Sequence, residues 1–266
     1  MIIIKNIIFP AILGVIEGVS EFFPVSSSGH IIIFSNFFKI PNHNIQILNT
    51  IIQTGASLSI LLHFKKKFIE MLLQITNKTK NINNNLSYYH IILGNTPIII
   101  LGLIIHKYII YTFNHTSIIY ALTCGTILLL ITEIIKPKLH LKKKICILKT
   151  LIIGLFQCLA LWPGFSRSCA TISGGILSGL KQSTAIKFSF MLSVPIFFGA
   201  CCINIIENIS YISINNIQEL IIGFLSAFIT SNITIKKSLN IIKSCSFMPF
   251  IIYRTILSII ILYLNK

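Results

Sequence analysis

The stretch from Gly14 to His30, "GVIEGVSEFFPVSSSGH", carries two carboxylates inside an otherwise apolar part of the chain. Glu17 and Glu21 are two of only six acidic residues among 266, and their spacing of four places both on one face of a helix. Two carboxylates this close in a low dielectric are tolerable if one is protonated or if a cation lies between them. Mg²⁺ or Ca²⁺ suits such a pair, because hard cations take oxygen ligands. The alternative is a structural pair of neutral, hydrogen-bonded glutamic acids.

The polar cluster that closes this stretch offers groups for anion binding and proton transfer. Ser26, Ser27 and Ser28 can cap a helix that starts near Gly29 or His30, and free N–H groups at a helix start bind phosphate. An imidazole titrates near neutrality, so His30 suits acid–base work. Taken singly, serine runs usually cap helices and an isolated histidine is usually structural. Together with two glutamates in one cluster, they indicate a site.

A second polar cluster, "LWPGFSRSCATISGG", contains Arg167, one of only two arginines in the chain. A permanent cation in a buried loop needs an anion, and arginine contacts phosphate with two donors at once. The hydroxyl groups around it belong to Ser166, Ser168 and Thr171. The alternative is a structural Arg167–Glu21 ion pair. The two clusters together predict phosphoryl transfer, in which cations neutralise charge and a base activates a nucleophile.

The composition places these clusters in a membrane. Residues are 54% hydrophobic and only 11% charged, whereas soluble domains are about 25% charged. The net charge of +16 comes from lysines in short blocks between apolar runs, which is typical of cytoplasmic loops. No basic face with interleaved aromatic residues appears, so we expect no nucleic-acid partner.

Apolar runs near 20 residues predict an all-α polytopic membrane protein. We expect six transmembrane helices, at 45–64, 88–106, 117–135, 185–205, 217–235 and 249–264. The segments 7–38 and 147–180 are interrupted by the polar clusters, and each half is too short to cross. Because broken backbone at membrane depth needs protein or water around it, we expect two re-entrant helix–loop–helix hairpins.

The lysine-rich loops 65–87, 136–149 and 236–248 are predicted inside, and loops 107–116 and 206–216 outside. The first hairpin then enters from outside and the second from inside, and three spans follow each. This predicts one membrane domain, 1–266, built from two inverted repeats, 1–135 and 145–266, with a site where the broken helices meet. Gly14 precedes Ser26 by twelve residues, as Gly154 precedes Ser166.

Both polar clusters closely resemble the signature motifs of the undecaprenyl-diphosphate phosphatase family, the bacitracin-resistance proteins. The resemblance continues through "IIQTGA", "FSFMLSVPIFFGA" and "FMPFIIYR" and covers essentially the whole chain. It implies a bacterial inner-membrane enzyme that hydrolyses undecaprenyl diphosphate to the monophosphate and phosphate, recycling the carrier lipid for peptidoglycan synthesis. It also implies a site facing the periplasm, a divalent cation (Mg²⁺ or Ca²⁺) and a homodimer.

By position, the resemblance assigns catalytic roles to Glu17, Glu21, Ser27, His30 and Arg167. The two glutamates hold the metal, and the substrate-binding set is Ser26, Ser28, Gly29, Gln53, Ser166, Ser168 and Thr171. We expect Ser27 or a water beside it to attack, with His30 as acid–base partner.

The chain also departs from the family pattern. Ser28 stands where threonine is common, Cys169 replaces a usual glycine and is expected to stiffen or crowd its loop, and Asn49 and Lys187 stand where glutamate is frequent. Inverted repeats with a midplane charged site are also typical of transporters, so a flippase for the polyprenyl phosphate, or a non-catalytic lipid-binding protein, stays an alternative.

Overall fold

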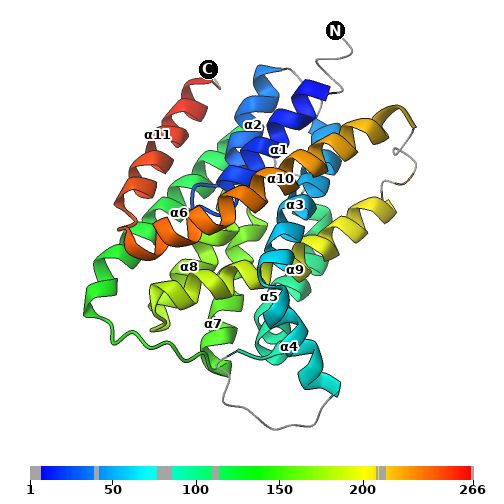
Figure 1. Ribbon diagram of the computed structural model, residues 1–266. Helices are drawn as coiled ribbons and strands as arrows, with labels where there is room; N and C mark the ends of the chain where they lie inside the picture. Colours follow the sequence, from blue (N-terminus) through cyan, green and yellow to red (C-terminus); the bar gives the residue numbers. More distant parts are fainter. Residues whose placement is uncertain are drawn as a thin grey trace.

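The computed structural model describes residues 7–38, 42–76, 86–109, 114–207, 209 and 214–264 (Figure 1). Within these ranges the chain is helical, and pairing between extended segments is limited to one bridge, Lys142 with Leu180. The helices are α1 (Phe9–Ser20), α2 (Ser27–Phe37), α3 (Asn42–His63), α4 (Lys65–Thr76), α5 (Tyr88–Ile109), α6 (His115–Ile135), η3 (Lys136–Lys138), α7 (Ile147–Gln157), η4 (Cys158–Leu161), α8 (Arg167–Leu177), α9 (Gln182–Glu207), α10 (Ile214–Ser244) and α11 (Met248–Leu264).

Each predicted span coincides with a helix, namely α3, α5, α6, α9, α10 and α11. In the described part of the chain, four helices are long and apolar enough to cross a membrane, and a fifth crossing arises if α3 and α4 count as one bent span. The α11 helix is apolar but shorter. The all-α, multi-pass membrane class is therefore confirmed, and the exact number of six spans stays a prediction.

Two of the predicted loops are helical over most of their described residues. The predicted loop 65–87 begins with α4, which departs from α3 by a bend of 75°, and the predicted loop 236–248 begins inside α10, which continues to Ser244. Lysine is a good helix former, so a lysine-rich segment that leaves the apolar layer can remain helical. The lysines indicate that these segments lie outside the apolar layer, but they do not exclude helical structure there.

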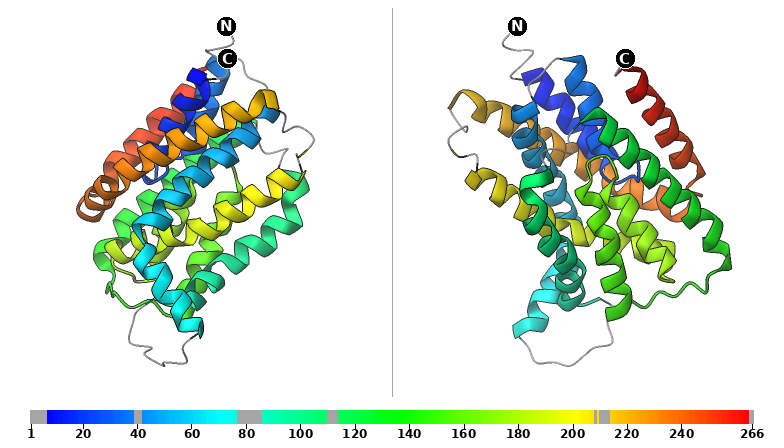
Figure 2. Two further views of the ribbon diagram at one scale, coloured as in Figure 1. Left: turned by 45° about the vertical axis from the view of Figure 1, so that its right-hand side comes forward. Right: turned by 180° about the vertical axis from the view of Figure 1, so that it is seen from behind.

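The two interrupted segments each form a pair of helices joined by an irregular turn. Residues 21–26 connect α1 to α2, and residues 158–166, which include η4, connect α7 to α8. The α1–α2 pair lies near the end where the two chain termini are found, whereas α7 starts at the opposite end, beside α4 (Figures 1 and 2). The two hairpins therefore point toward each other, and their turns meet inside the bundle.

The two turns share an unusual backbone conformation. Ser26 has a φ of 70° and Ser166 a φ of 77°, and these are the non-glycine residues with positive φ in the described chain. Each side chain then accepts a hydrogen bond from the N–H three residues later, Gly29 and Cys169 respectively, both at 3.3 Å. A strained φ costs about 1–3 kcal/mol and persists where surroundings fix it, so both turns are held rigidly at equivalent positions.

Close helix contacts hold each hairpin against the bundle. A Cβ at Gly14 in α1 would lie 2.6 Å from the carbonyl oxygen of Gly223 in α10, and a Cβ at Gly154 in α7 would lie 2.6 Å from that of Gly94 in α5. Without a hydrophobic drive between helices in lipid, small residues permit the van der Waals contact that associates them. Glycine at these positions thus positions the hairpin that carries each polar cluster.

We expect Gly14→Ala to lower the stability of the protein by about 1–3 kcal/mol, because the added methyl meets α10 backbone that cannot move aside. Thermal unfolding of the detergent-solubilised protein measures this. Gly199→Ala is the matched control, since no atom lies within 4 Å of its Cβ position. Equal unfolding midpoints for the two variants would contradict the close packing of α1 on α10.

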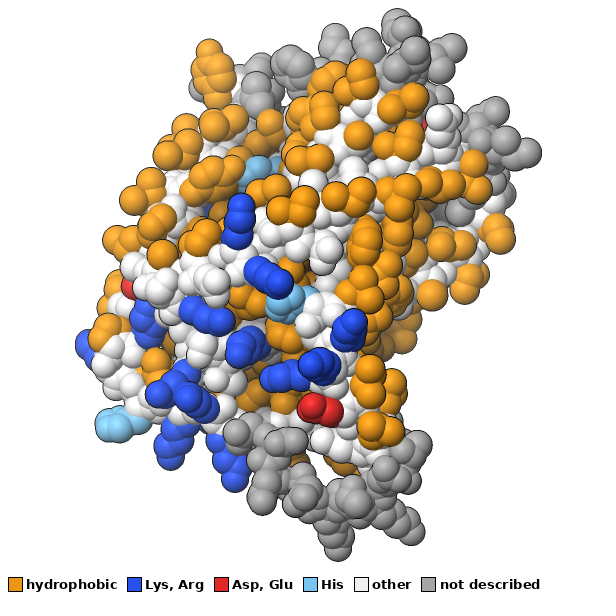
Figure 3. Space-filling model, viewed as in Figure 1, with side chains coloured by type: hydrophobic (Ala, Val, Ile, Leu, Met, Phe, Trp, Pro, Cys, Tyr) orange, Lys and Arg blue, Asp and Glu red, His pale blue; other side chains and the backbone are white. Residues whose placement is uncertain are grey.

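Charge and apolar surface separate along the molecule. On the face seen in Figure 3, lysine and arginine side chains gather over the lower half, whereas the upper half, nearer the termini, is mostly hydrophobic. Large apolar side chains are exposed along the helices, among them Leu103 (64% exposed) and Ile104 (68% exposed). An apolar surface of this extent is suited to lipid rather than to water.

Candidate active site

The turns of the two hairpins touch through polar groups of both clusters. The N–H of Gly164 donates to Ser28 Oγ at 3.2 Å, and Ser168 Oγ donates to the carbonyl oxygen of Phe23 at 3.0 Å. The structure therefore brings together residues about 140 positions apart, as the sequence predicted. These hydrogen bonds fix the two clusters as one unit.

A buried ion pair lies at this junction. Arg167 Nη2 is 2.8 Å from Glu21 Oε1, and both side chains are less than one-tenth exposed. The other oxygen of the same carboxylate, Oε2, accepts a hydrogen bond of 2.8 Å from Ser27 Oγ. The predicted ion pair is thus present, and it places a carboxylate between the guanidinium and a hydroxyl. The guanidinium could equally pair with another anion, since arginine binds carboxylate and phosphate oxygens through the same donors.

The guanidinium of Arg167 is held from its other side by α9. Nη1 donates to the backbone oxygen of Ser189 at 2.6 Å, and the ring of Phe197 lies 5.2 Å from the guanidinium carbon. Thr171 Oγ1 lies 2.6 Å from Ser189 Oγ and completes this support. The Nε of Arg167 is buried and has no hydrogen-bond partner. One strong donor of the arginine is therefore available for a ligand.

Glu17, one turn before Glu21, is fully buried, and both of its carboxylate oxygens lack a hydrogen-bond partner. Buried polar groups in proteins are almost always satisfied, so an acceptor group with two free oxygens indicates a missing cation or proton. The donor set here consists of the oxygens of Glu17, Glu21 and the nearby Ser27, which are hard ligands suited to Mg²⁺ or Ca²⁺. The described residues include no cluster of three or more His, Cys, Asp or Glu side chains that could hold a metal, so a cation bound here would also need oxygens from hydroxyls, water or substrate.

His30 is oriented by two partners. Its Nδ1 lies 2.7 Å from the carbonyl oxygen of Ser26, and its Nε2 lies 2.6 Å from the hydroxyl of Tyr253. A carbonyl only accepts hydrogen bonds, so Nδ1 carries a proton, and in the neutral ring Nε2 accepts one from Tyr253. Our prediction placed His30 as the base for Ser27, but the acceptor at hydrogen-bond distance from Ser27 is Glu21. The helical turn of α2 points the two side chains to different partners.

The remaining predicted residues differ in how they join the site. Ser26 and Ser166 cap their helices, and each also lies near a second hydroxyl, Ser28 at 3.3 Å and Ser168 at 3.1 Å. Gln53 is half-buried on α3 and the structure gives it no hydrogen bond, so its contact with substrate stays a prediction.

Arg254, for which no role in the site was predicted, ties both turns to the bundle. Its buried guanidinium donates to four oxygens, those of Pro24, Phe165, Leu122 and the hydroxyl of Thr126, at 3.0–3.2 Å. Tyr253 and Ser189 were also missed, because their contacts with the site cross the bundle. For Arg254 and Tyr253, the one signal in the sequence was the segment "FMPFIIYR", which contains both. Cys169, expected to crowd its loop, is accommodated, with its thiol donating to the carbonyl of Gly125 at 3.3 Å.

The fold and the site together define an all-helical, multi-pass membrane protein with a buried carboxylate–arginine–serine centre where two helical hairpins meet. The chain belongs to the family of the bacitracin resistance protein BacA, whose pattern it matches over residues 10–260.

Three curated relatives that align with nearly the whole chain have the same name. The undecaprenyl-diphosphatase of Buchnera aphidicola subsp. Baizongia pistaciae is 63% identical over 262 residues, with 98% of both chains covered. That of Buchnera aphidicola subsp. Acyrthosiphon pisum (strain Tuc7) is 45% identical over the full length of both chains. That of Baumannia cicadellinicola is 40% identical, with 99% of both covered.

Proposed function

We propose that this protein is an undecaprenyl-diphosphatase, which hydrolyses undecaprenyl diphosphate to undecaprenyl phosphate and inorganic phosphate. This recycles the carrier lipid for peptidoglycan synthesis and confers bacitracin resistance. The observation that carries the proposal is the buried contact of Arg167 with Glu21, which in turn accepts from Ser27, in a chain of this family. The flippase alternative is not favoured, because the relatives are named for the hydrolysis.

In the mechanism that we propose, the terminal phosphate of the substrate replaces Glu21 as the partner of Arg167. The free Nε and the displaced Nη2 then contact two phosphate oxygens, and Ser26, Ser28, Ser166, Ser168, Thr171 and the N–H of Gly29 surround the group with further donors. The freed carboxylate of Glu21 remains beside Ser27 Oγ and accepts its proton.

Ser27 Oγ, or a water molecule in its place, forms the new bond to the terminal phosphorus while the bond to the bridging oxygen breaks. Undecaprenyl phosphate leaves with the bond's electron pair, and His30, in its doubly protonated form, donates the Nε2 proton to the leaving oxygen. Solvent then reprotonates His30 and takes the serine proton from Glu21. If Ser27 attacks, water then hydrolyses the phosphoserine and regenerates the enzyme. Both routes use the same residues and differ only in the attacking oxygen.

Release of inorganic phosphate by the purified protein tests the function. Farnesyl or undecaprenyl diphosphate is the substrate, with Mg²⁺ or Ca²⁺ present. We expect phosphate and the prenyl monophosphate in equal amounts. Absence of phosphate release would refute the enzyme, and transport of the monophosphate without cleavage would support the flippase instead.

We also propose that Glu17 and Glu21 hold a divalent cation, Mg²⁺ or Ca²⁺, whose chemistry is to neutralise charge on the diphosphate. The unpartnered oxygens of Glu17 support this. We expect Glu17→Gln to raise the Mg²⁺ concentration for half-maximal activity at least about tenfold, because one anionic ligand is lost. The control is Glu70→Gln, an exposed carboxylate on α4. An unchanged metal requirement in both Glu17→Gln and Glu21→Gln would refute metal binding at this pair.

Tyr253 is expected to act as a positioning residue through His30. Tyr253→Phe removes the hydroxyl that bonds Nε2 at 2.6 Å and keeps the ring that stacks on the imidazole. We expect kcat to fall about tenfold while KM stays within about twofold, because a misplaced proton donor affects the chemical step. Tyr263→Phe, at a residue 79% exposed, is the control. A loss confined to KM would contradict this role.

For the membrane arrangement, we propose six spans, two re-entrant hairpins and an inverted repeat of 1–135 and 145–266. The matched serine turns, the hairpins entering from opposite ends and the lysines gathered at one end support it. In this arrangement the protein lies in the bacterial inner membrane, and the site opens to the periplasm on the side of the chain termini. The exposed thiol of Cys146 then faces the cytoplasm, and a membrane-impermeant maleimide is expected to label it only after lysis.

The homodimer that the resemblance implies is likewise a proposal. Light scattering from the detergent-solubilised protein distinguishes it from a monomer.

A further inference from the structure

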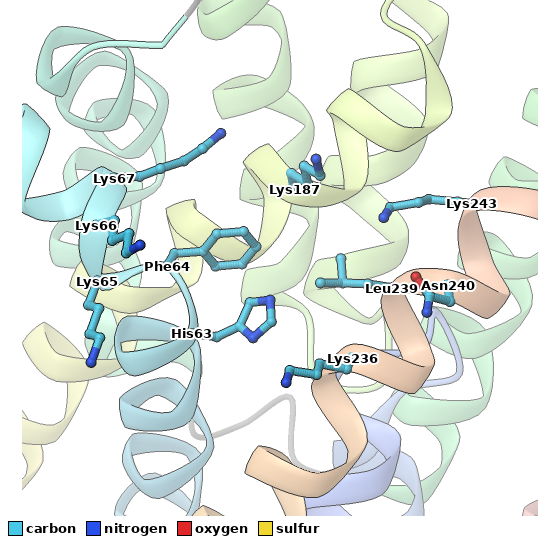
Figure 4. Close-up of a pocket in the computed structure, with 10 residues that line it drawn as sticks. All are labelled: His63, Phe64, Lys65, Lys66, Lys67, Lys187, Lys236, Leu239, Asn240 and Lys243. Atoms are coloured by element: carbon cyan, nitrogen blue, oxygen red, sulfur yellow. The ribbon is translucent and has the colours of Figure 1, made fainter.

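A basic cavity lies at the end of the molecule opposite the chain termini. It has a volume of about 540 Å³ and is formed by the α3–α4 junction, the start of α9 and the last turns of α10 (Figure 4). Six of its lining residues are lysines: Lys65, Lys66, Lys67, Lys187, Lys236 and Lys243. We call this cavity the lysine groove. It shares no residue with the site between the hairpins.

Several of these side chains converge. Lys67 extends from α4 toward the start of α9, and Lys236 and Lys243 extend from α10 toward α3, while Lys65 points away from the others (Figure 4). His63 points into the space between α3 and α10, beside Phe64. Cationic groups that line one cavity repel one another, and an anion between them reduces this repulsion.

The protein itself supplies almost no anion here. Of the six glutamates, Glu17 and Glu21 lie in the hairpin site and Glu133 bonds Lys136. Glu207 and Glu219 lie some 20 residues and 17 residues along α9 and α10 from the lysines of those helices, which is about 25–30 Å of helix.

Glu70 on α4, three residues after Lys67, is the acidic residue closest in sequence to the lysines of the groove. Among the described residues, no hydrogen bond or ion pair engages any of the six ammonium groups. The groove is therefore a cation-rich hollow with no anionic partner from the described part of the protein, which favours binding of an external anion.

The surroundings of the groove are suited to a lipid. The bend of 75° turns α4 away from the axis of α3, so the two helices run in different directions. It begins with three lysines and then exposes Ile69 (53%) and Leu72 (63%), the pattern of a helix lying at a membrane surface. The buried side chains of Phe64 and Leu239 give the groove an apolar floor. Lysines at the headgroup level beside such a helix attract anionic lipids.

We propose that the lysine groove binds the phosphate headgroup of an anionic phospholipid from the adjacent membrane leaflet, with the acyl chains against the apolar face of α4. The headgroup phosphate lies between the ammonium groups of α4, α9 and α10 and so links three helices. Soluble phosphate would meet the same lysines but would leave the apolar face of α4 unused, so it is expected to bind more weakly.

The test uses the purified full chain in detergent and measures ligand adducts by native mass spectrometry. The probes are dioctanoyl phosphatidylglycerol, dioctanoyl phosphatidylcholine and inorganic phosphate. We expect phosphatidylglycerol to bind at least about tenfold more tightly than either of the others, because it alone combines net negative charge with acyl chains. Binding should weaken as salt is raised, since the lysines are exposed.

Two variants locate the binding. Lys66→Gln/Lys236→Gln/Lys243→Gln is expected to weaken phosphatidylglycerol binding about 100-fold, since each basic side chain near a headgroup contributes about fivefold. Lys187→Glu, which places a carboxylate in the groove, is expected to weaken it at least about tenfold on its own. The matched control is Lys138→Gln/Lys143→Gln/Lys144→Gln, three exposed lysines at the same end of the molecule but outside the groove.

The substituted lysines are exposed apart from Lys243, which is half-buried, and unchanged unfolding midpoints without lipid will show that the variants fold. Equal losses in the groove variant and the control would overturn the site, because they would indicate general surface charge. Equal affinity for inorganic phosphate and phosphatidylglycerol would overturn the lipid as the ligand. Neither result depends on phosphatase activity.

Discussion

Arg167→Lys is expected to lower kcat/KM for prenyl diphosphate hydrolysis by about 10²–10³-fold, the loss typical of removing one donor that stabilises charge in a transition state. A lysine ammonium is a point charge and cannot contact Ser189 and Glu21 at once, as the guanidinium does over 2.6 and 2.8 Å. It also lacks the Nε donor that is unpartnered here. A phosphate displacing Glu21 would therefore meet one donor rather than a planar pair.

The second arginine provides the control for this experiment. Arg254 is equally buried, but its partners are three carbonyl oxygens and one hydroxyl, with no carboxylate among them. Arg254→Lys leaves several buried acceptors unsatisfied, which costs about 1–3 kcal/mol for each. We expect it to lower the unfolding midpoint more than Arg167→Lys does, and to retain more activity in the fraction that stays folded. Full activity in Arg167→Lys would refute the bidentate contact with phosphate.

The two hairpins were predictable from sequence because the features that define them are local. A short apolar run, a polar cluster and a second short apolar run cannot form one span, and the equal spacing from Gly14 to Ser26 and from Gly154 to Ser166 aligned the two turns. The matched positive φ angles of these serines are consistent with that alignment. Local pattern also predicted which residues meet, since both clusters interrupt helices at similar depth.

The residues on other helices that hold the site in place were not predictable in the same way. Ser189, Tyr253 and Arg254 lie in apolar runs that read as ordinary spans, and their roles depend on which helix faces contact the turns. Such contacts join positions as much as 230 residues apart, as in the bond from Arg254 to Pro24. The hydrogen bond of Ser27 with Glu21 was not predicted, for a related reason. Sequence proximity favoured His30, three residues on, whereas the turn at 21–26 folds Glu21 back onto the hydroxyl.

The lysine groove was also not predictable from the sequence, because it forms only where distant segments meet. Its lysines come from three separate segments, and two of those segments were predicted as cytoplasmic loops because of their charge. The charge pattern therefore predicted the end of the molecule at which they lie but not the cavity. The bend between α3 and α4 and the extension of α10 to Ser244 bring them together.

Ser27→Ala is expected to reduce kcat by at least about 10³-fold if Ser27 Oγ attacks phosphorus, because the covalent route is then closed. If water attacks and Ser27 only positions it, the loss should stay within about 10–100-fold, the scale of one neutral hydrogen bond in the site. The hydroxyl lies 2.8 Å from Glu21 Oε2 in a buried position, so a proton acceptor is already in place for either route. Single-turnover kinetics on a short-chain prenyl diphosphate measures the difference.

Covalent trapping separates the two routes directly. With substrate labelled in the terminal phosphate, acid quenching within one turnover should leave label on the wild-type protein if a phosphoserine forms, and none on Ser27→Ala. Ser28→Ala is the matched control, because its hydroxyl accepts from the N–H of Gly164 rather than bonding a carboxylate. Label that persists in Ser27→Ala would exclude this serine as the nucleophile. Glu21→Gln should abolish labelling even with Ser27 intact and Mg²⁺ at saturating concentration, because an amide cannot accept the serine proton, and loss that saturating Mg²⁺ does not restore would assign the base to Glu21 rather than to His30.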